Sequence, residues 1–509
     1  MPVLNFLSKA FLGFHYRKLC KELESPIEYQ RETLATIFAI NKNTEWAKAY
    51  GLGEKSTYAE FADRVPCVEY EAIRTSIERM QQGEYDVLCG GRVKMFSKSS
   101  GTTGGKSKFL PVTQRFLENC HIKGPRDLMG AWLNENPDSN LFKANSRSII
   151  MGGSLQEVGD AVIGDISALM LYNTPSFFKQ FIFPNVETLM LPKWEEKIEL
   201  IARASLNENL VSFGGVPTWT LVLIKRLLEL GNKDDLSEMF PNLELYMHGG
   251  VSFAPYLPQF QQLIKNPNFQ YRQIYNASEG FFAAQLTGES TAMSLLVNNG
   301  IFYEFIKFSD YQTANQIIIP LEQVEPSVNY VMLITTISGL YRYLVGDTVR
   351  FESVSPHYKL QVTGRTKHYI NAFGEELMVE NTDTALARVC LKHQVLVNDY
   401  TVAPIYMTAK NNTEAGHQWL IEFEVEPASI TQFAAELDQE LQALNSDYEA
   451  KRYQNIAMKN LKITPLPPNS FNQWLKRKGK LGGQHKVPRL LNDRSVVDDL
   501  LNSLNYEGS

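Results

Sequence analysis

The sequence is poor in cysteine and histidine, the two residue types that build disulfide frameworks and zinc sites. Its 509 residues include five cysteines, which are widely spaced and form no CxxC pair. A disulfide framework is therefore not expected, and a reducing, cytoplasmic setting is favoured. The eight histidines show no HxxxH or paired Cys/His spacing, so the sequence gives a zinc site no support.

Long apolar runs, repeats and an excess of positive charge are also missing. No stretch approaches the roughly 20 apolar residues that span a bilayer, and residues 1–20 have the mixed pattern of an amphipathic surface helix, not of a signal peptide. No repeat with a period of about 20 to 50 residues is present, which excludes solenoids and propellers. The net charge of −6 argues against a protein that mainly holds nucleic acid on a basic surface. We therefore expect no membrane or nucleic-acid partner. A monomer is also expected.

What the sequence does contain is 44% hydrophobic residues, enough for a large core. At about 150 residues per domain, the length suggests two or three domains. Between about residues 145 and 280, short apolar runs at 148–151, 211–214, 243–247 and 271–275 predict strands. An apolar stripe at 218–230 predicts a helix with Gly231 as its C-cap. Strands that alternate with helices indicate an α/β sheet.

After residue 300 the pattern changes to hairpins. It predicts a strand at 330–337, a turn at 338–339, and returning strands at 340–345 and 348–353. Beyond about residue 370, a hairpin with strands at 401–409 and 418–425 precedes a helical stripe at 430–444. The predicted class is α/β. A large N-terminal domain, 1–366, combines mixed sheets flanked by helices with a β-barrel-like hairpin region, and a smaller α+β domain covers 367–509.

The segment 97–108, SKSSGTTGGKSK, has the composition of a phosphate-binding loop. Its glycines let backbone N–H groups approach a phosphate, and its hydroxyls and lysines add donors and charge. The alternative is a flexible polar loop. A Walker A loop is excluded, because Ser100 stands where its first glycine would be.

Two further segments carry polar groups beside predicted strands. Tyr275 ends a strand and can stack on a purine, while Ser278 and Glu279 can reach phosphate and magnesium; the alternative is the capped start of a helix. Asp347 follows Gly346 at a predicted hairpin turn and can accept both hydroxyls of a ribose; the alternative is an ordinary aspartate in a β-turn. The residue two before Ser278 is Asn276, so the segment does not match the GxSxG elbow of a serine nucleophile.

A basic stretch at 476–489 contains six lysine and arginine residues and no acidic one. Its glycines predict a mobile loop that can deliver a cation to a polyphosphate. The alternatives are a solvated loop or a nonspecific patch for nucleic acid.

The order of these motifs resembles the GH3 family of acyl acid–amido synthetases, a branch of the acyl-adenylating superfamily, and points to a bacterial-type member. The resemblance covers essentially the whole chain. It includes the loop 99–105 with Lys108, the Tyr-x-x-Ser-Glu motif at 275–279 and the Tyr-Arg-x-x-Val-Gly-Asp motif at 341–347. At the C-terminus, Gln484, Lys486 and 488–489 match the family pattern, with His485 at the usual aromatic position. Lys108 stands where acyl-CoA synthetases usually carry glycine, which favours the amido-synthetase branch.

The resemblance implies a substrate pair and a set of contacts. A carboxylic acid would be activated as an acyl adenylate by ATP and Mg²⁺, and an amino acid would then take the acyl group. Lys486 would contact the α-phosphate as a catalytic residue, and Glu279 would be catalytic and hold magnesium. The implied nucleotide-binding residues are Ser99, Ser100, Gly101, Thr102, Thr103, Lys108, Gly249, Gly250, Tyr275, Ser278, Tyr341, Asp347 and Arg365. A hinge near 365–371 would bring the small domain and Lys486 to the site.

Three other functions stay open. A thioester-forming ligase would present coenzyme A to the same adenylate, although no coenzyme A nucleotide site is recognisable. A catalytically inactive nucleotide-binding regulator is expected to have lost Lys486 or Glu279, and both residue types are present. A nucleic-acid binder is the weakest alternative, because the basic stretch is short and lacks interleaved aromatic residues apart from Trp474 just before it.

Overall fold

The computed structural model describes residues 2–99, 108–254, 256–311, 313, 316–366, 369–370, 372–373, 375, 377–405, 416–452, 458–480 and 486–504. The chain divides into two compact units. The first contains Met1–Gly250 and Ile264–Val362, and the second contains Val251–Leu263 and Thr363–Ser509. The short segment Val251–Leu263 is thus grouped with C-terminal residues, which nothing in the sequence suggested. The domain ranges 1–366 and 367–509 stay a prediction.

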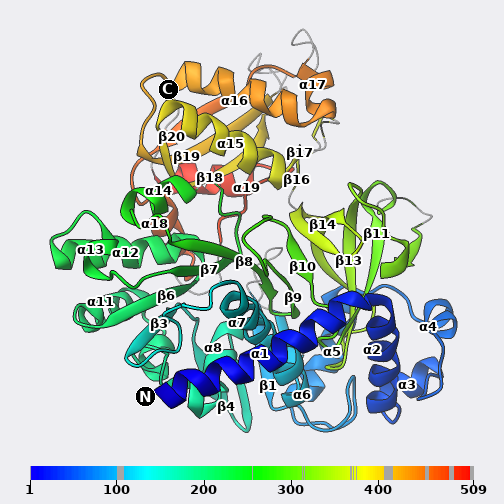
Figure 1. Cartoon of the computed structure of the whole chain (residues 1–509). Coiled ribbons are helices and arrows are strands. Elements are labelled where there is room, and N and C mark those ends of the chain that lie inside the picture. The colour runs from blue at the N-terminus through cyan, green and yellow to red at the C-terminus, as the bar shows by residue number, and fades with distance from the viewer. Residues whose placement is uncertain are drawn as a thin grey trace. The chain divides into compact units, whose positions relative to one another are not determined.

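One large sheet runs through the first unit, in the order β12-β11-β13-β14-β15-β10-β9-β8-β7-β6-β3 (Figure 1). The neighbours β3, β6, β7 and β8 are parallel, whereas β8–β9 and β11–β13–β14 are antiparallel. The strands are β3 (Ser146–Ile150), β6 (Asn209–Gly215), β7 (Leu245–Gly249), β8 (Gln270–Ala277), β9 (Gly280–Ala284), β10 (Met293–Leu295), β11 (Ile301–Lys307), β12 (Ile318–Pro320), β13 (Asn329–Thr336), β14 (Tyr343–Ser353) and β15 (Lys359–Arg365).

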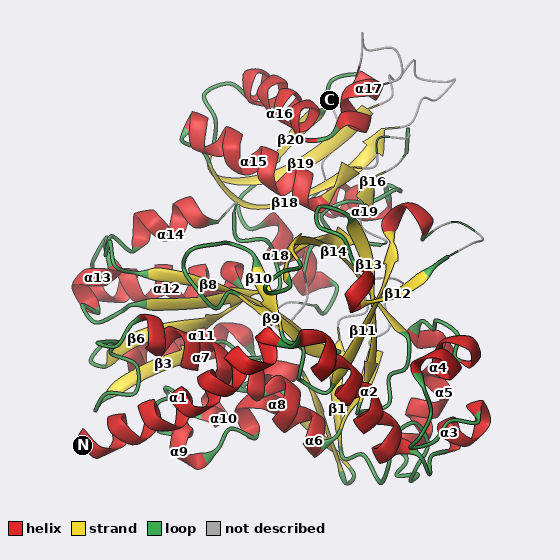
Figure 2. Cartoon of the chain, turned by 45° about the vertical axis from the view of Figure 1, so that its right-hand side comes forward, coloured by secondary structure: helices red, strands yellow, loops and turns green. Residues whose placement is uncertain are grey.

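A smaller sheet of the same unit has the order β2-β1-β5-β4, with bounds β1 (Met95–Ser99), β2 (Lys108–Val112), β4 (Leu155–Val158) and β5 (Ala161–Gly164). Helices lie around both sheets (Figure 2). They are α1 (Pro2–Glu24), α2 (Pro26–Asn41), α3 (Glu45–Tyr50), α4 (Tyr58–Arg64), α5 (Tyr70–Gln81), α6 (Gln114–Phe116), α7 (Lys123–Glu135), α8 (Ile166–Tyr172), α9 (Ser176–Lys179), α10 (Val186–Leu189), α11 (Trp194–Ser205), α12 (Pro217–Gly231) and α13 (Leu236–Met239), with the π-helical turn η1 (Leu117–His121) and the 3-10 turns η2 (Phe308–Asp310) and η3 (Leu321–Gln323).

Local sequence signals fix several helix ends. Thr57 caps α4 through a reciprocal pair of hydrogen bonds with Glu60, which satisfies backbone donors that the first turn leaves open. α12 begins at Pro217, whose missing N–H costs nothing at that position. The helix ends one residue later than predicted: Gly231 is its last residue, and the left-handed cap is Asn232, at φ 49°.

The second unit is a three-stranded sheet with helices on both faces. The order is β18-β19-β20, and β19 pairs antiparallel with β18 and parallel with β20. Successive side chains of a strand point to opposite faces: Trp419 packs in a core with α15 and α16, and Leu420 in a second core with α18 and α19. The elements are α14 (Leu257–Leu263), β16 (Tyr369–Ile370), β17 (Leu377–Met378), α15 (Val379–His393), β18 (Leu396–Ile405), β19 (Gly416–Val425), α16 (Ile430–Leu444), α17 (Ser446–Arg452), β20 (Lys462–Leu466), α18 (Ser470–Arg477) and α19 (Ser495–Ser503).

The predicted α/β class with mixed sheets is confirmed, and two local predictions are corrected. The two returning strands expected at 340–345 and 348–353 are the single strand β14, so Gly346 and Asp347 lie inside a strand and not at a hairpin turn. The first two residues of the basic stretch predicted to be a mobile loop, Lys476 and Arg477, end the helix α18, whose Phe471 and Trp474 are buried in a core. Core packing of these two aromatic residues overrides the local abundance of charge.

Within the described ranges, no helix combines the length and the apolar composition needed to cross a membrane.

Candidate functional site

The parallel strands of the first unit end in glycine-rich turns on one edge of the sheet. β6 ends at Gly215 and β7 at Gly249, and Gly250 follows at φ 85°. A Cβ atom on Gly249 would lie 2.4 Å from the carbonyl oxygen of Ile274, so only glycine allows this approach of β7 to β8. The carboxyl ends of parallel strands are where open α/β sheets bind ligands. Gly249 and Gly250 therefore lie at the edge where a nucleotide would be expected.

At the end of β8, Tyr275 joins two motifs that are 72 residues apart in the sequence. Its hydroxyl donates a hydrogen bond of 2.7 Å to Oδ2 of Asp347, and the side chains are 8% and 6% exposed. The ring packs against Phe282, with the centroids 4.8 Å apart. The hydroxyl bond orients the Asp347 carboxylate, so the structure brings these two predicted site residues together.

A bulge in β14 places Asp347. Val331 pairs with Thr348 and Leu333 with Leu344, so three residues of β14, 345–347, lie opposite the single residue Met332. Gly346 takes φ 87° inside this bulge, a conformation that side-chain-bearing residues rarely adopt. Bulges redirect side chains and are frequent next to active sites. The Val-Gly-Asp spacing is thus explained by a bulge rather than by the turn that we predicted.

Ser278 and Glu279 form the turn between β8 and β9, and not a helix start. Both are buried, at 4% and 9% exposure, and within the described residues the Ser278 hydroxyl has no hydrogen-bond partner. Buried polar groups almost always have a partner, so this hydroxyl fits a site that receives a ligand or a water. Glu279 supplies a carboxylate at the same turn, which is the ligand type that Mg²⁺ accepts together with substrate phosphates.

His121 lies behind this hairpin and was not predicted. It ends the π-helical turn η1, and its Nδ1 is 3.3 Å from Oδ1 of Asn276 on β8. Burial lowers the pKa of His121 to about 4, so the ring is neutral at physiological pH. Its Nε2 has no hydrogen-bond partner within the described residues. A lone histidine without ligand-like spacing to other histidines or cysteines carries no sequence signal, so only the structure could reveal it.

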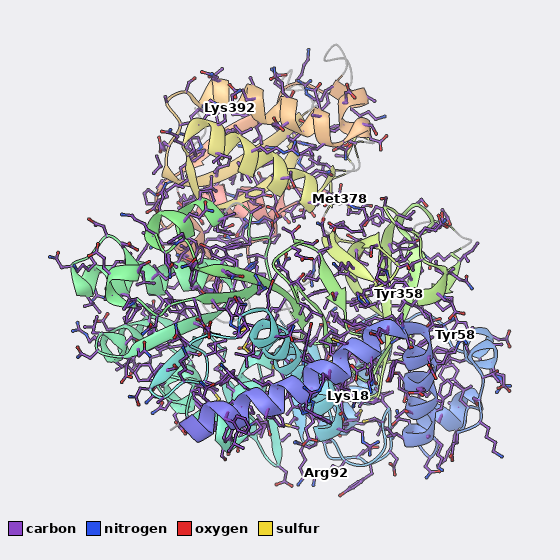
Figure 3. All side chains as sticks on the ribbon, viewed as in Figure 1. Lys18, Tyr58, Arg92, Tyr358, Met378 and Lys392 are labelled. Carbon is purple, nitrogen blue, oxygen red and sulfur yellow. The ribbon has the colours of Figure 1, made fainter. Side chains whose placement is uncertain are left out.

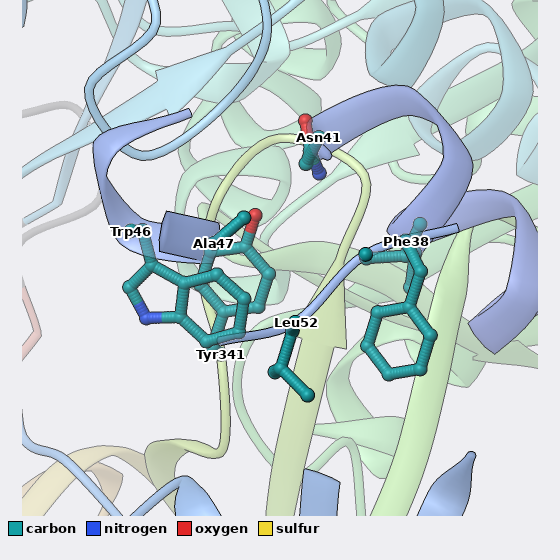
Figure 4. Close-up of a pocket in the computed structure, with 8 residues that line it drawn as sticks. Phe38, Asn41, Trp46, Ala47, Leu52 and Tyr341 are labelled. Atoms are coloured by element: carbon teal, nitrogen blue, oxygen red, sulfur yellow. The ribbon is translucent and has the colours of Figure 1, made fainter. Parts of the chain in front are cut away.

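Tyr341 and Arg342, at the start of the Tyr-Arg-x-x-Val-Gly-Asp motif, make contacts that stabilise the fold. The Tyr341 ring stacks on Trp46 at 3.4 Å, and its hydroxyl donates to the Leu88 carbonyl at 2.7 Å. Figure 4 shows this stack in a pocket lined by α2 and α3, which contains no other predicted site residue. These contacts occupy the Tyr341 side chain, and its contact with a nucleotide stays a prediction.

Arg342 forms a buried ion pair with Glu304. Its Nε and Nη2 donate to the carboxylate at 3.0 and 2.6 Å, and its Nη1 donates to the carbonyls of Ala62 and Val65, both at 3.0 Å. The hydroxyl of Tyr58, labelled in Figure 3, also donates to Glu304 at 3.0 Å. Arg342 therefore ties β11 to α4 and the segment after it.

The hairpin β1–β2 carries the ends of the glycine-rich loop. Ser99 and Lys108 are opposite each other in its register, and Nζ of Lys108 lies 5.7 Å from the centre of the Tyr70 ring. The predicted residues Ser100, Gly101, Thr102 and Thr103 lie outside the described residues. The structure therefore describes the two strands that bracket the loop and leaves the phosphate-binding role as a prediction.

Arg365 and Lys486 belong to the second unit. Arg365 is the last residue of β15, and Lys486 is exposed at the start of a segment that joins the β18 strand. Of the predicted hinge at 365–371, residues 367, 368 and 371 lie outside the described residues, as do Gln484 and His485. No group of three or more His, Cys, Asp or Glu side chains with metal-binding geometry is found in the described part of the chain.

Three family models match the chain in order. They are "GH3 family N-terminal domain" at residues 15–140 and 161–269, "GH3 family central domain" at 294–365 and "GH3 family C-terminal domain" at 380–495. Among curated relatives, the putative indole-3-acetic acid-amido synthetase GH3.9 of Arabidopsis thaliana is 22% identical and is covered, like this chain, over 95% of its length. The 4-substituted benzoates-glutamate ligase GH3.12 of the same plant is 23% identical, over 95% of this chain and 96% of the relative.

Solved structures show the same fold. The GH3.15 acyl acid amido synthetase has a TM-score of 0.78 at 17% identity, over 96% of this chain and 95% of that one. A 2-hydroxyisobutyryl-CoA ligase, in the postadenylation state with 2-HIB-AMP, has a TM-score of 0.58 at 12% identity, over 96% and 92%. At these identities the likeness establishes the architecture.

Proposed function

Because the chain belongs to the GH3 family, we propose that it is an ATP-dependent acyl acid–amido synthetase. The relatives that cover nearly its whole length are named as ligases that join an acid to an amine, and the fold is also that of an adenylate-bound ligase. The observation that carries the proposal is the 2.7 Å bond between Tyr275 and Asp347. It brings two of the implied nucleotide-binding motifs together at the ligand edge of the sheet.

The first half-reaction activates the acid. A carboxylate is a poor electrophile because its charge repels nucleophiles and oxide does not leave. Attack of the substrate carboxylate on the α-phosphorus of ATP forms a new P–O bond and expels pyrophosphate, which leaves an acyl adenylate. Asp347 would accept the ribose hydroxyls, and Lys486 would stabilise the charge that develops on the α-phosphate oxygens.

Magnesium fits the residues of this site through Glu279. Mg²⁺ is usually held by one or two carboxylates together with substrate phosphates, which matches a single buried carboxylate at the β8–β9 turn. When bound, the ion supplies charge neutralisation at the phosphates. Ser278 directly precedes Glu279 in the sequence and is also buried. Its hydroxyl would donate a hydrogen bond to a phosphate oxygen.

The second half-reaction makes the amide. The amino group of an amino acid attacks the acyl carbon, the acyl–oxygen bond to AMP breaks, and the amine proton passes to solvent or to the departing phosphate. Water competes for the same adenylate, so closure of the site would protect it. The family relatives favour this amide product over a coenzyme A thioester.

Several more specific properties stay predictions. They are a bacterial type of the family, a cytoplasmic and monomeric protein, a lack of nucleic-acid or membrane partners, and the contacts of Ser99–Thr103, Lys108, Gly249, Gly250 and Arg365 with the nucleotide.

The test is acid-dependent pyrophosphate release by the purified chain, with aryl, indolyl and fatty acids, with and without pooled amino acids. We expect release with at least one acid, an amide product detectable by mass, and loss of both in Lys486→Ala. Product only with coenzyme A would establish the thioester ligase instead. Binding of ATP without pyrophosphate release from any acid would support the inactive regulator.

A further inference from the structure

The chain just after Lys486 is fastened to the sheet of the second unit by its backbone. The carbonyl of Pro488 accepts a hydrogen bond of 2.6 Å from the Thr401 hydroxyl, and the carbonyl of Arg489 accepts one of 2.8 Å from the Val402 N–H. Lys486 itself is exposed. The exposed side chain of Lys486 therefore begins a segment whose following residues, 488 and 489, are held by hydrogen bonds to β18.

The side chain of Arg489 reinforces this attachment. Its Nη1 bonds the Asp399 carboxylate and donates to the Tyr400 carbonyl at 2.8 Å, and its Nη2 donates to the Tyr256 hydroxyl at 2.6 Å. The guanidinium also lies 4.4 Å from the centre of the Tyr400 ring. The side chain is 12% exposed, so these bonds are shielded from water and stronger than surface bonds.

Tyr256 belongs to the short segment that the second unit takes from the middle of the chain. Three side chains of this segment form hydrogen bonds to the rest of the second unit. Ser252 hydrogen-bonds Asp383, Tyr256 accepts from Arg489, and Gln259 Nε2 donates to the Val397 carbonyl at 2.9 Å.

We propose that Arg489 and Tyr256 are positioning residues. They hold the backbone next to Lys486 so that the lysine can contact the α-phosphate while the substrate carboxylate attacks ATP. Lysine has four rotatable bonds, so its ammonium reaches a fixed point only if its backbone is fixed, and a misplacement of about 1 Å can cost about a hundredfold in rate. The segment of Tyr256 continues directly from Gly249 and Gly250. The hydrogen bond of Tyr256 therefore joins this segment to Arg489, three residues after the lysine. The proposal rests on the proposed function for the role of Lys486.

The first test needs no activity. Tyr256→Phe removes one hydroxyl, and Tyr448→Phe is its matched control, because the buried Tyr448 hydroxyl donates to Asp438 at 2.7 Å in the same unit. Hydrogen exchange is measured on peptides that contain the Val402 amide. We expect exchange about fivefold to tenfold faster in Tyr256→Phe and unchanged in Tyr448→Phe. Equal protection in Tyr256→Phe and wild type would overturn the positioning role.

The second test uses pyrophosphate release. We expect Tyr256→Phe to lower kcat about tenfold with KM for ATP unchanged, as when an interaction made in the transition state weakens. In a Lys486→Arg background, which keeps a cation at this position, the same substitution should cause little further loss, since the two residues act as one unit. Additive losses, or an equal loss in Tyr448→Phe, would overturn the proposal.

The two tests separate the two proposals. Wild-type protein that releases no pyrophosphate with any acid counts against the amido-synthetase function. In that case the hydrogen-exchange result still decides whether Arg489 and Tyr256 fix the segment that carries Lys486.

Discussion

The two ends of the segment 341–347 show how one motif divides between scaffold and site. At its start, Arg342 is 4% exposed and shares a buried ion pair with Glu304. At its end, Asp347 is 6% exposed and meets Tyr275 at the ligand edge of the sheet. The two side chains are similarly buried, and both are of ionisable types. The two residues differ in their partners. Arg342 bonds Glu304 and backbone carbonyls of the scaffold, whereas Asp347 lies in the β14 bulge and accepts a hydrogen bond from Tyr275.

Backbone geometry at the two positions supports this division. Arg342 takes φ 44°, a left-handed conformation that costs free energy for any residue with a side chain. Its bonds to Glu304, Ala62 and Val65 offset this cost. Gly346 takes its positive φ without such a cost, because it has no side chain.

The largest expected effect is on stability at the scaffold end. Arg342→Met removes the cation and leaves the buried Glu304 carboxylate without its charge partner, which we expect to lower the free energy of unfolding by about 3 to 5 kcal/mol. Urea unfolding followed by circular dichroism measures the loss. Adding Glu304→Gln should restore part of it. An unfolding free energy close to that of wild type would show that Arg342 is not a scaffold residue.

At the site end we expect a loss of nucleotide binding without a loss of fold. Asp347→Asn keeps the size of the side chain and removes the charge that would accept the ribose hydroxyls. A hydrogen bond to a charged group is worth about 1.5 to 3 kcal/mol, so KM for ATP should rise about tenfold to a hundredfold. Steady-state kinetics of pyrophosphate release give KM, and thermal unfolding controls for the fold. An unchanged KM with reduced stability would move Asp347 to the scaffold.

The buried His121, next to the site, predicts how the stability of the protein depends on pH. Its pKa in the folded protein is about 4, below the ordinary 6.5, because burial disfavours the cation. The unfolded chain therefore binds a proton that the folded chain does not, and stability falls as the pH drops from 6.5 towards 4. By pH 5 this costs about 2 kcal/mol.

In His121→Gln, we expect the stability difference between pH 7 and pH 5 to shrink by about that amount. His15 and His248, with pKa values lowered to about 4 and about 3, keep their own contributions in the variant. Urea titrations at both pH values measure the change. An unaltered pH dependence would mean that folding leaves the pKa of His121 near its ordinary value.

The smallest effects come from two matched tyrosines. Tyr341→Phe and Tyr275→Phe each remove one buried hydroxyl bond of 2.7 Å, and each should cost about 1 kcal/mol of stability. Only Tyr275→Phe should also raise KM for ATP, by a few-fold, because its bond orients Asp347. Parallel kinetics and thermal unfolding compare the two variants. A raised KM in Tyr341→Phe would instead place Tyr341 with the nucleotide.

Periodicity in the sequence was sufficient for much of the fold. The helix at 430–444 was predicted with the bounds of α16, because its apolar stripe repeats at helical spacing and Ser429 caps it. The predicted strands at 211–214, 271–275 and 330–337 agree with β6, β8 and β13 to within one or two residues at each end. Short apolar runs bounded by glycine and polar residues make such elements recognisable.

Three features were outside the reach of such patterns. The bulge at Asp347 depends on the pairing of β14 with β13, since the register on a neighbouring strand decides that three residues lie opposite one. The grouping of Val251–Leu263 with the C-terminal residues depends on contacts of Tyr256 and Gln259 with residues more than 130 positions away. The different roles of Tyr341 and Asp347 depend on their partners: Tyr341 stacks on Trp46, and Asp347 accepts a hydrogen bond from Tyr275. No local sequence pattern connects either pair.

The sequence alone thus determined the α/β class and, through the resemblance of its ordered motifs, the family and the residues to consider. Those properties reside in local periodicity and in residue type, which the chain displays without folding. Only the tertiary structure decided which charged residue of a motif supports the fold and which is presented to a ligand. That choice is made by burial and hydrogen-bond partners from distant segments, and they meet only when the strands take their register.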